Sequence, residues 1–362
     1  MNIEQLTIEN FKCFKSEKTF DFSRLTILTG ANSSGKSSVM YAVLMVIQTE
    51  DFPSFLSPNG NFVRLGDFRE IVNQHDSNRV LQIGITYKSQ LFKTFWIKDE
   101  VSQLPKILKI QAVDNDKLDA LKETKRVSLK NATSSLYHKT NYISAFRQTP
   151  QRTYYEQNKA NYKVGTEGEE YIDQIVEWDK RSNGKIKELV NIMAKLDLIE
   201  EIKINRFGGG RFEVIVKPVN SNLLTSLANV GFGVSQFLPI IVADLQLPND
   251  STLFLAEPEI HLHPSVQSKF GEYIVNQINN SDKNYVIETH SEYFLNRIRL
   301  AIVKGELKKE DIKVYFLENT KDDTEVYDIQ FTTTGVINNA PKNFFETYFA
   351  DSMAITLNAF AE

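Results

Sequence analysis

Short apolar runs in the first hundred residues of the chain predict buried strands. Residues 3–8 carry Ile, Leu and Ile at a spacing that favours a strand. The apolar run 25–29 ends at a glycine, and residues 38–44 continue as an apolar-rich segment typical of a helix. Residues 80–87 are rich in isoleucine and valine, which indicates a further strand.

The final third of the chain shows the same kind of pattern. Strands are predicted at 252–255, 285–287 and 312–317, with helical segments between them. Short apolar strands separated by helices indicate a mostly parallel sheet covered on both faces. We therefore predict an α/β fold built around a mixed sheet.

The middle of the chain has a different character. Between residues 101 and 206 strand signals become sparse, and Lys, Asn, Gln and Tyr become frequent. Apolar residues recur at helical spacing within 185–201, which predicts an amphipathic helix. Glycines at 208–210 then interrupt the pattern, and residues 212–216 alternate as in a strand. We interpret 101–206 as a largely helical insertion between two halves of one core, residues 1–100 and 207–362.

Composition limits the class of protein. The chain has 362 residues, 41% of them hydrophobic and 24% charged, which is ordinary for a globular protein. One cysteine, Cys13, excludes an internal disulfide framework. The start of the chain lacks the pattern of a signal peptide, and the apolar stretch 237–247 is too short to span a bilayer. We therefore expect a cytoplasmic protein without a membrane partner.

The net charge of −4 is unevenly distributed. Residues 101–163 hold 12 Lys and Arg against 5 Asp and Glu. Such an excess can mark a surface that binds DNA or RNA, although a solvated basic helix face would look the same. Tyrosines lie among the basic residues and would suit base stacking, or they could be the core of the insertion. The set comprises Tyr137, Lys139, Tyr142, Arg147, Arg152, Tyr154, Tyr155, Tyr162 and Lys163.

The strongest motif is a glycine-rich loop between the strand 25–29 and the following helix. In such a loop the backbone amides converge on phosphate groups, and the glycines let the main chain approach closely. Lys36 would place positive charge near the β and γ phosphates, and the Ser37 hydroxyl can bind Mg²⁺. The flanking strand and helix argue against a chance match. The predicted ATP-binding residues are Gly30, Ala31, Asn32, Ser33, Ser34, Gly35, Lys36, Ser37 and Ser38.

Two further strands end in polar residues. The apolar strand 252–255 leads into Glu257 and Glu259, which could orient water and hold a metal beside the phosphates. Glu259 could equally start the next helix, because acidic residues suit that position. The strand 285–287 leads towards His290, which could donate a hydrogen bond to a γ-phosphate. A lone histidine is more often structural, but its place at a strand end favours function.

A fourth motif occupies residues 229–236. Gly231 and Gly233 free the backbone just before a predicted helix, and Ser235 lies at the start of that helix. Helix N-termini of this kind bind anions. The signal is weak alone, because glycine pairs before helices are common.

Together and in this order, the four motifs resemble the nucleotide-binding core of ABC-class ATPases, in the branch that contains SMC, RecF and OLD-type proteins. Residues 6–14 resemble the N-terminal strand and loop of that branch. Residues 231–236 resemble its signature motif, and His290 its switch histidine. The resemblance covers residues 1–100 and 210–362.

The resemblance implies a homodimer with composite ATP sites. One protomer would supply the phosphate loop, acidic strand and switch histidine, and its neighbour would supply Gly233, Ser235 and Gln236. ATP would hold the two protomers together until hydrolysis released them.

The resemblance also assigns chemical roles. Glu257 aligns with the catalytic base that polarises the attacking water, and His290 would be the second catalytic residue. Ser37 and Glu257 would hold Mg²⁺. Glu288 and Thr289 are supporting candidates.

One position departs from the pattern of the family. An acidic residue normally precedes the catalytic glutamate and helps to hold the hydrated Mg²⁺, but this chain has Ala256 there. Either Glu257 or Glu259 covers both tasks, or hydrolysis is slow and the protein acts mainly as an ATP-gated clamp. Loss of a carboxylate that supports a metal lowers affinity or activity by about 10- to 100-fold, so turnover need not vanish.

Two functions of different classes follow. The first is an ATPase whose ATP-dependent dimerisation controls a nucleic-acid-linked process, such as antiphage defence or DNA repair. The second is a scaffold with little turnover that holds a separately encoded effector, for example a nuclease. The sequence shows no acidic cluster suited to two-metal nuclease chemistry, so a nuclease would be a separate partner.

Overall fold

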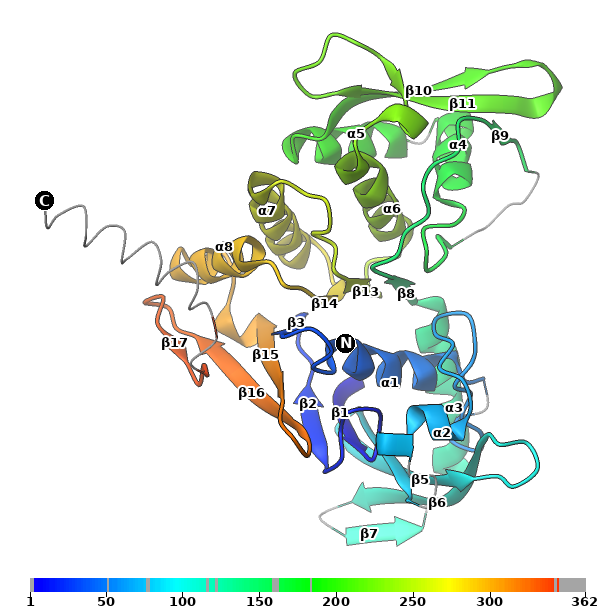
Figure 1. Ribbon diagram of the computed structural model, residues 1–362, viewed down its shortest axis with the longest axis vertical. Coiled ribbons are helices and arrows are strands. Elements are labelled where there is room, and N and C mark those ends of the chain that lie inside the picture. The colour runs from blue at the N-terminus through cyan, green and yellow to red at the C-terminus, as the bar shows by residue number, and fades with distance from the viewer. Residues whose placement is uncertain are drawn as a thin grey trace, which may run out of the picture.

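The computed structural model describes residues 3–50, 52–75, 79–114, 117–120, 123–157, 163–182, 184–341 and 344. The largest sheet in these ranges has seven strands and runs through the centre of the molecule (Figure 1). Its inner strands are parallel, and the β15–β16 and β16–β17 pairs are antiparallel, so the sheet is mixed as predicted. In spatial order the strands are β17 (Ile337–Asn338), β16 (Thr324–Phe331), β15 (Ile312–Asn319), β3 (Leu25–Gly30), β14 (Asn284–Glu288), β13 (Thr252–Ala256) and β8 (Thr140–Ile143).

Residues of the inner strands alternate between two hydrophobic cores. Leu253 and Leu255 of β13 belong to one core, whereas Phe254 and Ala256 belong to the other. Successive side chains of a strand point to opposite faces, and a parallel sheet is normally covered on both. Continuous apolar runs in the sequence are the consequence of this double burial.

Helices cover the two faces of the central sheet unequally. The first core contains buried residues of α4 to α8, and the second contains those of α1. Figure 1 accordingly shows α6, α7 and α8 on one face and α1 on the other. The helices are α1 (Lys36–Gln48), α2 (Phe68–Ile71), α3 (Glu123–His138), α4 (Tyr171–Arg181), α5 (Lys185–Lys195), α6 (Phe232–Gln246), α7 (Pro264–Asn280) and α8 (Glu292–Val303). Within the described ranges every helix is too short or too polar to cross a lipid bilayer.

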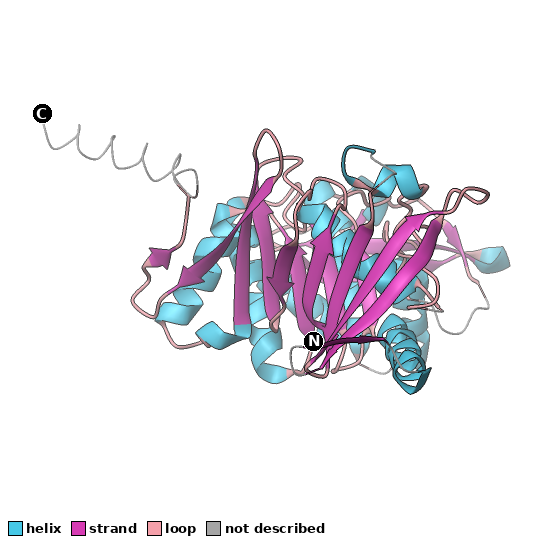
Figure 2. Ribbon diagram, turned by 90° about the horizontal axis from the view of Figure 1, so that it is seen from below, coloured by secondary structure: helices cyan, strands magenta, loops and turns pink. Residues whose placement is uncertain are grey.

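An antiparallel sheet encloses α1 from the far side. Buried residues of four of its strands, β1, β2, β4 and β5, share the second core with α1. In Figure 2, seen from below, strands form a broad layer with helices behind and beside it. Their spatial order is β2 (Lys18–Asp21), β1 (Ile3–Glu9), β4 (Leu81–Tyr87), β5 (Gln90–Lys98), β6 (Pro105–Asp114) and β7 (Lys117–Ala120).

A small sheet packs with α4, α5 and α6 in the other half of the molecule. The long strands β10 (Ile199–Arg206) and β11 (Arg211–Pro218) form an antiparallel pair. The short strands β9 (Tyr154–Tyr155) and β12 (Thr225–Ser226) both pair with β11.

The segment 101–206 differs from the helical insertion that the sequence predicts. Strand β6 continues the antiparallel sheet, and β8 joins the central sheet beside β13. Lys106, Leu108 and Lys109 of β6 are exposed, so polar and apolar residues mix on the outer face and hide the strand pattern. The predicted helix over 185–201 ends at Lys195, and β10 follows it.

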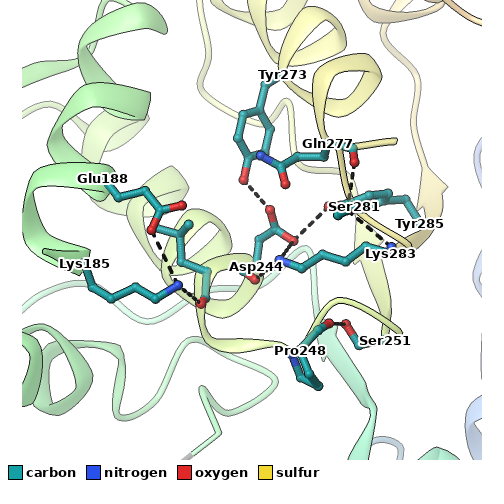
Figure 3. Close-up of polar contacts among 11 residues, drawn as sticks. Lys185, Glu188, Asp244, Pro248, Ser251, Tyr273, Gln277, Ser281, Lys283 and Tyr285 are labelled. Atoms are coloured by element: carbon teal, nitrogen blue, oxygen red, sulfur yellow. Dashed lines mark hydrogen bonds and ion pairs between the residues drawn. The ribbon is translucent and has the colours of Figure 1, made fainter. Parts of the chain in front are cut away.

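A buried ion pair links two of the layers (Figure 3). Asp244 of α6 is 1% exposed and accepts a hydrogen bond from the Lys283 ammonium at 3.1 Å. The hydroxyl of Tyr285 donates to the same carboxylate at 2.9 Å, and that of Tyr273 donates to its second oxygen. A buried charge needs such partners, because an uncompensated one is strongly unfavourable in the interior. The four residues tie α6 and α7 to β14 and the turn before it.

Candidate nucleotide-binding site

The phosphate loop leaves the central sheet at Gly30 and ends where α1 begins. Gly35 is the residue before α1 and has φ 100°, a left-handed conformation that favours glycine. The Lys36 ammonium donates hydrogen bonds to the carbonyls of Gly30 and Ala31, at 3.1 and 2.8 Å. The Asn319 amide donates to the Ser33 carbonyl at 2.8 Å, which ties the loop to β15. The contiguous motif is therefore folded as a loop that can enclose phosphate.

Gly30 cannot carry a side chain in this arrangement. Its φ is 131°, and a Cβ atom would lie 2.1 Å from the Leu317 carbonyl oxygen on β15. We predict that Gly30→Ala lowers the free energy of unfolding by at least ~1–3 kcal/mol, the cost of one strained backbone position. Chemical denaturation checks this against Gly208→Ala, because a Cβ at Gly208 meets nothing within 4 Å. Equal unfolding midpoints for the two variants would show that β15 can move aside.

Glu288 brings a carboxylate to the first turn of α1. The Ser37 hydroxyl donates to Glu288 Oε1 at 2.9 Å, and the Glu288 side chain is buried at the end of β14. Burial raises the pKa of Glu288, while the Ser37 hydrogen bond and the Lys36 charge oppose the rise. The second oxygen, Oε2, has no hydrogen-bond partner among the described residues. This carboxylate thus has one oxygen committed to Ser37 and one available.

Glu257 and His290 face each other beside the loop. His290 Nε2 lies 3.9 Å from Glu257 Oε1, and each side chain is about one-third exposed, at 36% and 32%. Burial and the Lys36 charge lower the pKa of His290, with Glu257 opposing, and this shift favours the neutral imidazole. A neutral ring can still donate one N–H to a phosphate oxygen. The predicted base and switch histidine are therefore brought together.

The Glu259 side chain forms hydrogen bonds with the turn that follows β14. Its Oε1 accepts hydrogen bonds from the Thr289 hydroxyl at 2.7 Å and from the His290 amide at 2.6 Å. Burial raises the pKa of Glu259, and these hydrogen bonds partly oppose that rise. Glu259 thus fixes the backbone of the turn that carries His290. It is not merely the start of α7, because α7 begins at Pro264.

Burial lowers the pKa of Lys36, and Glu288, Glu257 and Glu259 oppose this in decreasing order. Three carboxylates therefore act on one ammonium at the mouth of the loop. Mg²⁺ and the positive end of α1 would complete the charges that a triphosphate requires. Among the described residues, no group of three or more His, Cys, Asp or Glu side chains is arranged to hold a metal ion.

Arg147 is a site residue that sequence reasoning placed elsewhere. It follows β8, is 4% exposed, and donates from Nη2 to the Glu257 carbonyl at 3.1 Å. Burial lowers its pKa to about 10, against the attraction of Glu259 and Glu257. The interpretation of Arg147 as part of a nucleic-acid surface is wrong, because β8 carries it into the interior. No local pattern marks this role.

The other members of the basic and tyrosine-bearing set range from buried to exposed. Tyr142 is 4% exposed, and the Lys163 ammonium donates to the carbonyls of Tyr137 and Thr140, at 2.6 and 2.9 Å. Tyr154 stacks on Phe212. Tyr155 is exposed, and Tyr162 lies outside the described residues. The described members of the set therefore do not form one stacking surface.

The signature segment lies at the start of α6. Gly231 and Phe232 are exposed there, whereas Ser235 is 2% exposed and donates to the Phe232 carbonyl at 3.2 Å. Gln236 is buried as well. A Cβ on Gly233 would lie 2.9 Å from the His261 carbonyl, so this glycine permits close contact with the loop after β13. The signature and the phosphate loop belong to helices on opposite faces of the sheet.

The phosphate loop follows β3, a central parallel strand, and acidic residues and a histidine follow its spatial neighbours β14 and β13. This arrangement defines a P-loop ATPase of the ABC-like class. Residues 25–296 match the family model described as "AAA domain, putative AbiEii toxin, Type IV TA system". The chain belongs to this family.

The comparisons with individual proteins agree with this class. The chain is 23% identical over 328 residues to an "ATP/GTP phosphatase" of Helicobacter pylori, covering 81% of this chain and 86% of that protein. Among solved structures, an SMC head bound to the C-winged helix domain of ScpA aligns with a TM-score of 0.55 and 12% identity. That alignment covers 91% of this chain and 98% of the SMC head. The likeness to the SMC head confirms the predicted α/β fold, and the family match together with the Helicobacter pylori relative supports ATPase activity.

Proposed function

We propose that the protein hydrolyses ATP with Mg²⁺ and that bound ATP joins two copies through composite sites. The main support is the position of the signature segment, residues 231–236, at the start of α6. Helices α6 and α1 pack in different cores on opposite faces of the sheet. A signature segment that lies away from the phosphate loop of its own chain is suited to contact the nucleotide bound by a second copy. Mg²⁺ suits the donor set of a Ser37 hydroxyl, a buried carboxylate and phosphate oxygens.

The exposed surface at the start of α6 supports the same proposal. Phe232 is 59% exposed, and its ring lies 5.5 Å from that of His261. Phe146, which precedes Arg147, is 71% exposed. Exposed aromatic side chains beside a nucleotide site are typical of contacts made on association.

For the biological role, we propose a nucleic-acid-linked process such as antiphage defence or DNA repair. The family description names a toxin–antitoxin system, and the SMC head in the comparison is bound to a domain of another protein. Both support an ATPase that acts on a partner. Contact with DNA or RNA would have to use exposed basic residues such as Arg152, because Arg147 is internal.

A scaffold with slow turnover that holds a separately encoded effector such as a nuclease is the second candidate. Ala256 favours it, since the usual carboxylate before Glu257 is missing. Turnover of the parent protein separates the two candidates.

Dimerisation is tested with a variant that binds ATP without cleaving it. We expect Glu257→Gln to form a dimer only with ATP and Mg²⁺, measured by analytical ultracentrifugation. Adding Phe232→Glu should keep it monomeric, because a charge would be buried at the contact. The matched control is Leu108→Glu, which changes an exposed apolar residue (56% exposed) on β6. The proposal is contradicted if the variant that also carries Phe232→Glu still dimerises, or if Glu257→Gln alone never dimerises with ATP and Mg²⁺.

A further inference from the structure

Position 256 and position 288 are register partners on neighbouring parallel strands. Ala256 of β13 lies opposite Glu288 of β14, and both residues are buried. The methyl group of Ala256 has no atom that can bind a metal. The adjacent strand therefore presents a carboxylate at the level where β13 lacks one.

The Glu288 carboxylate is directed at the metal-binding end of the phosphate loop. Its Oε1 accepts the Ser37 hydroxyl at 2.9 Å, and Ser37 is the loop residue whose hydroxyl can bind Mg²⁺. Its Oε2 is buried without a hydrogen-bond partner in the described part of the chain. Leaving a carboxylate oxygen buried and unsatisfied costs free energy, which a cation or its water would offset.

The other two carboxylates of the site have different tasks. Glu259 is half-buried, and its Oε1 accepts from the Thr289 hydroxyl and the His290 amide, so that this oxygen is fixed by the turn. Its Oε2, like that of Glu288, has no hydrogen-bond partner among the described residues, but neither oxygen of Glu259 touches Ser37. Glu257 Oε1 faces His290, 3.9 Å from Nε2. Of the three, Glu288 is the one that touches Ser37.

We propose that Glu288 supplies the metal-supporting carboxylate that Ala256 cannot, so that this task has moved from the acidic strand to its neighbour. The inference rests on the proposed Mg²⁺-dependent use of ATP. Glu257 is then free to act on water, and a missing carboxylate at position 256 does not by itself imply slow hydrolysis.

The test measures the metal requirement of nucleotide binding in the full chain. A fluorescent ATP derivative is titrated with Mg²⁺, and bound Mn²⁺ is followed separately by electron paramagnetic resonance. We expect Glu288→Ala and Glu288→Gln to raise the half-saturating Mg²⁺ concentration by about 10- to 100-fold. Glutamine keeps an oxygen for Ser37 and nearly the same volume, so it removes charge without removing packing.

A control variant and a rescue double variant complete the test. The control Glu325→Gln changes an exposed carboxylate on β16, outside the site, and its Mg²⁺ requirement should match the parent's. Ala256→Asp combined with Glu288→Ala should return the requirement towards the parent value, because the carboxylate is restored one strand away. A parent-like Mg²⁺ requirement in both Glu288 variants overturns the inference. ATP binding that is independent of Mg²⁺ in the parent would instead overturn the proposed function.

Discussion

Replacing Glu257 with glutamine should lower ATP turnover by about 10²- to 10⁴-fold, the usual contribution of a general base. The carboxylate lies at the end of β13 with its Oε1 3.9 Å from the His290 imidazole, and its charge acts on Lys36. Glutamine keeps the shape of the side chain but cannot accept a proton from water. ATP affinity should stay within a few-fold of the parent, because Lys36 and the loop amides bind the phosphates.

Two variants bracket this measurement of phosphate release. Lys36→Ala should lose ATP binding as well as turnover, since the ammonium is removed from the loop. Glu325→Gln changes an exposed carboxylate on β16 and should leave turnover unchanged. If Glu257→Gln turns over like the parent, another group activates the water. If the parent binds ATP tightly without measurable turnover, the scaffold becomes the better description.

The phosphate loop could be predicted from sequence because it is local. The strand, the glycines and the helix that shape it lie within 25–48, and the structure reproduces this unit. The acidic strand and the histidine could be placed at strand ends for the same reason. Their meeting at one edge follows from the parallel order of β3, β14 and β13.

The relation between Ala256 and Glu288 could not be predicted in this way. In sequence the two residues are far apart, and only the register of β13 against β14 makes them neighbours. Arg147 is a similar case. The short strand β8 contains Thr140 and Asn141, both buried, and such polar residues do not signal a strand in the centre of a sheet. Without β8 in place, Arg147 looks like one more basic residue of an exposed segment.

The largest effect on stability is expected at the buried pair Asp244 and Lys283 (Figure 3). Their side chains are 1% and 8% exposed, and the Tyr273 and Tyr285 hydroxyls both donate to Asp244. Lys283→Met would leave the Asp244 charge buried with hydroxyl donors alone. Breaking a buried pair by removing one partner costs about 3–5 kcal/mol. Urea denaturation should show this loss, whereas Lys309→Met, whose side chain is 62% exposed, should stay within about 0.5 kcal/mol.

The double variant Asp244→Asn with Lys283→Met separates charge from packing. The amide keeps an oxygen that can accept from a tyrosine hydroxyl, and no unpaired charge remains in the interior. We therefore expect the double variant to be less destabilised than the sum of the two single variants, by roughly 0.5–3 kcal/mol. Strictly additive losses would show that the two charges do not stabilise one another. The network would then act through the tyrosine hydrogen bonds and the packing of α6, α7 and β14.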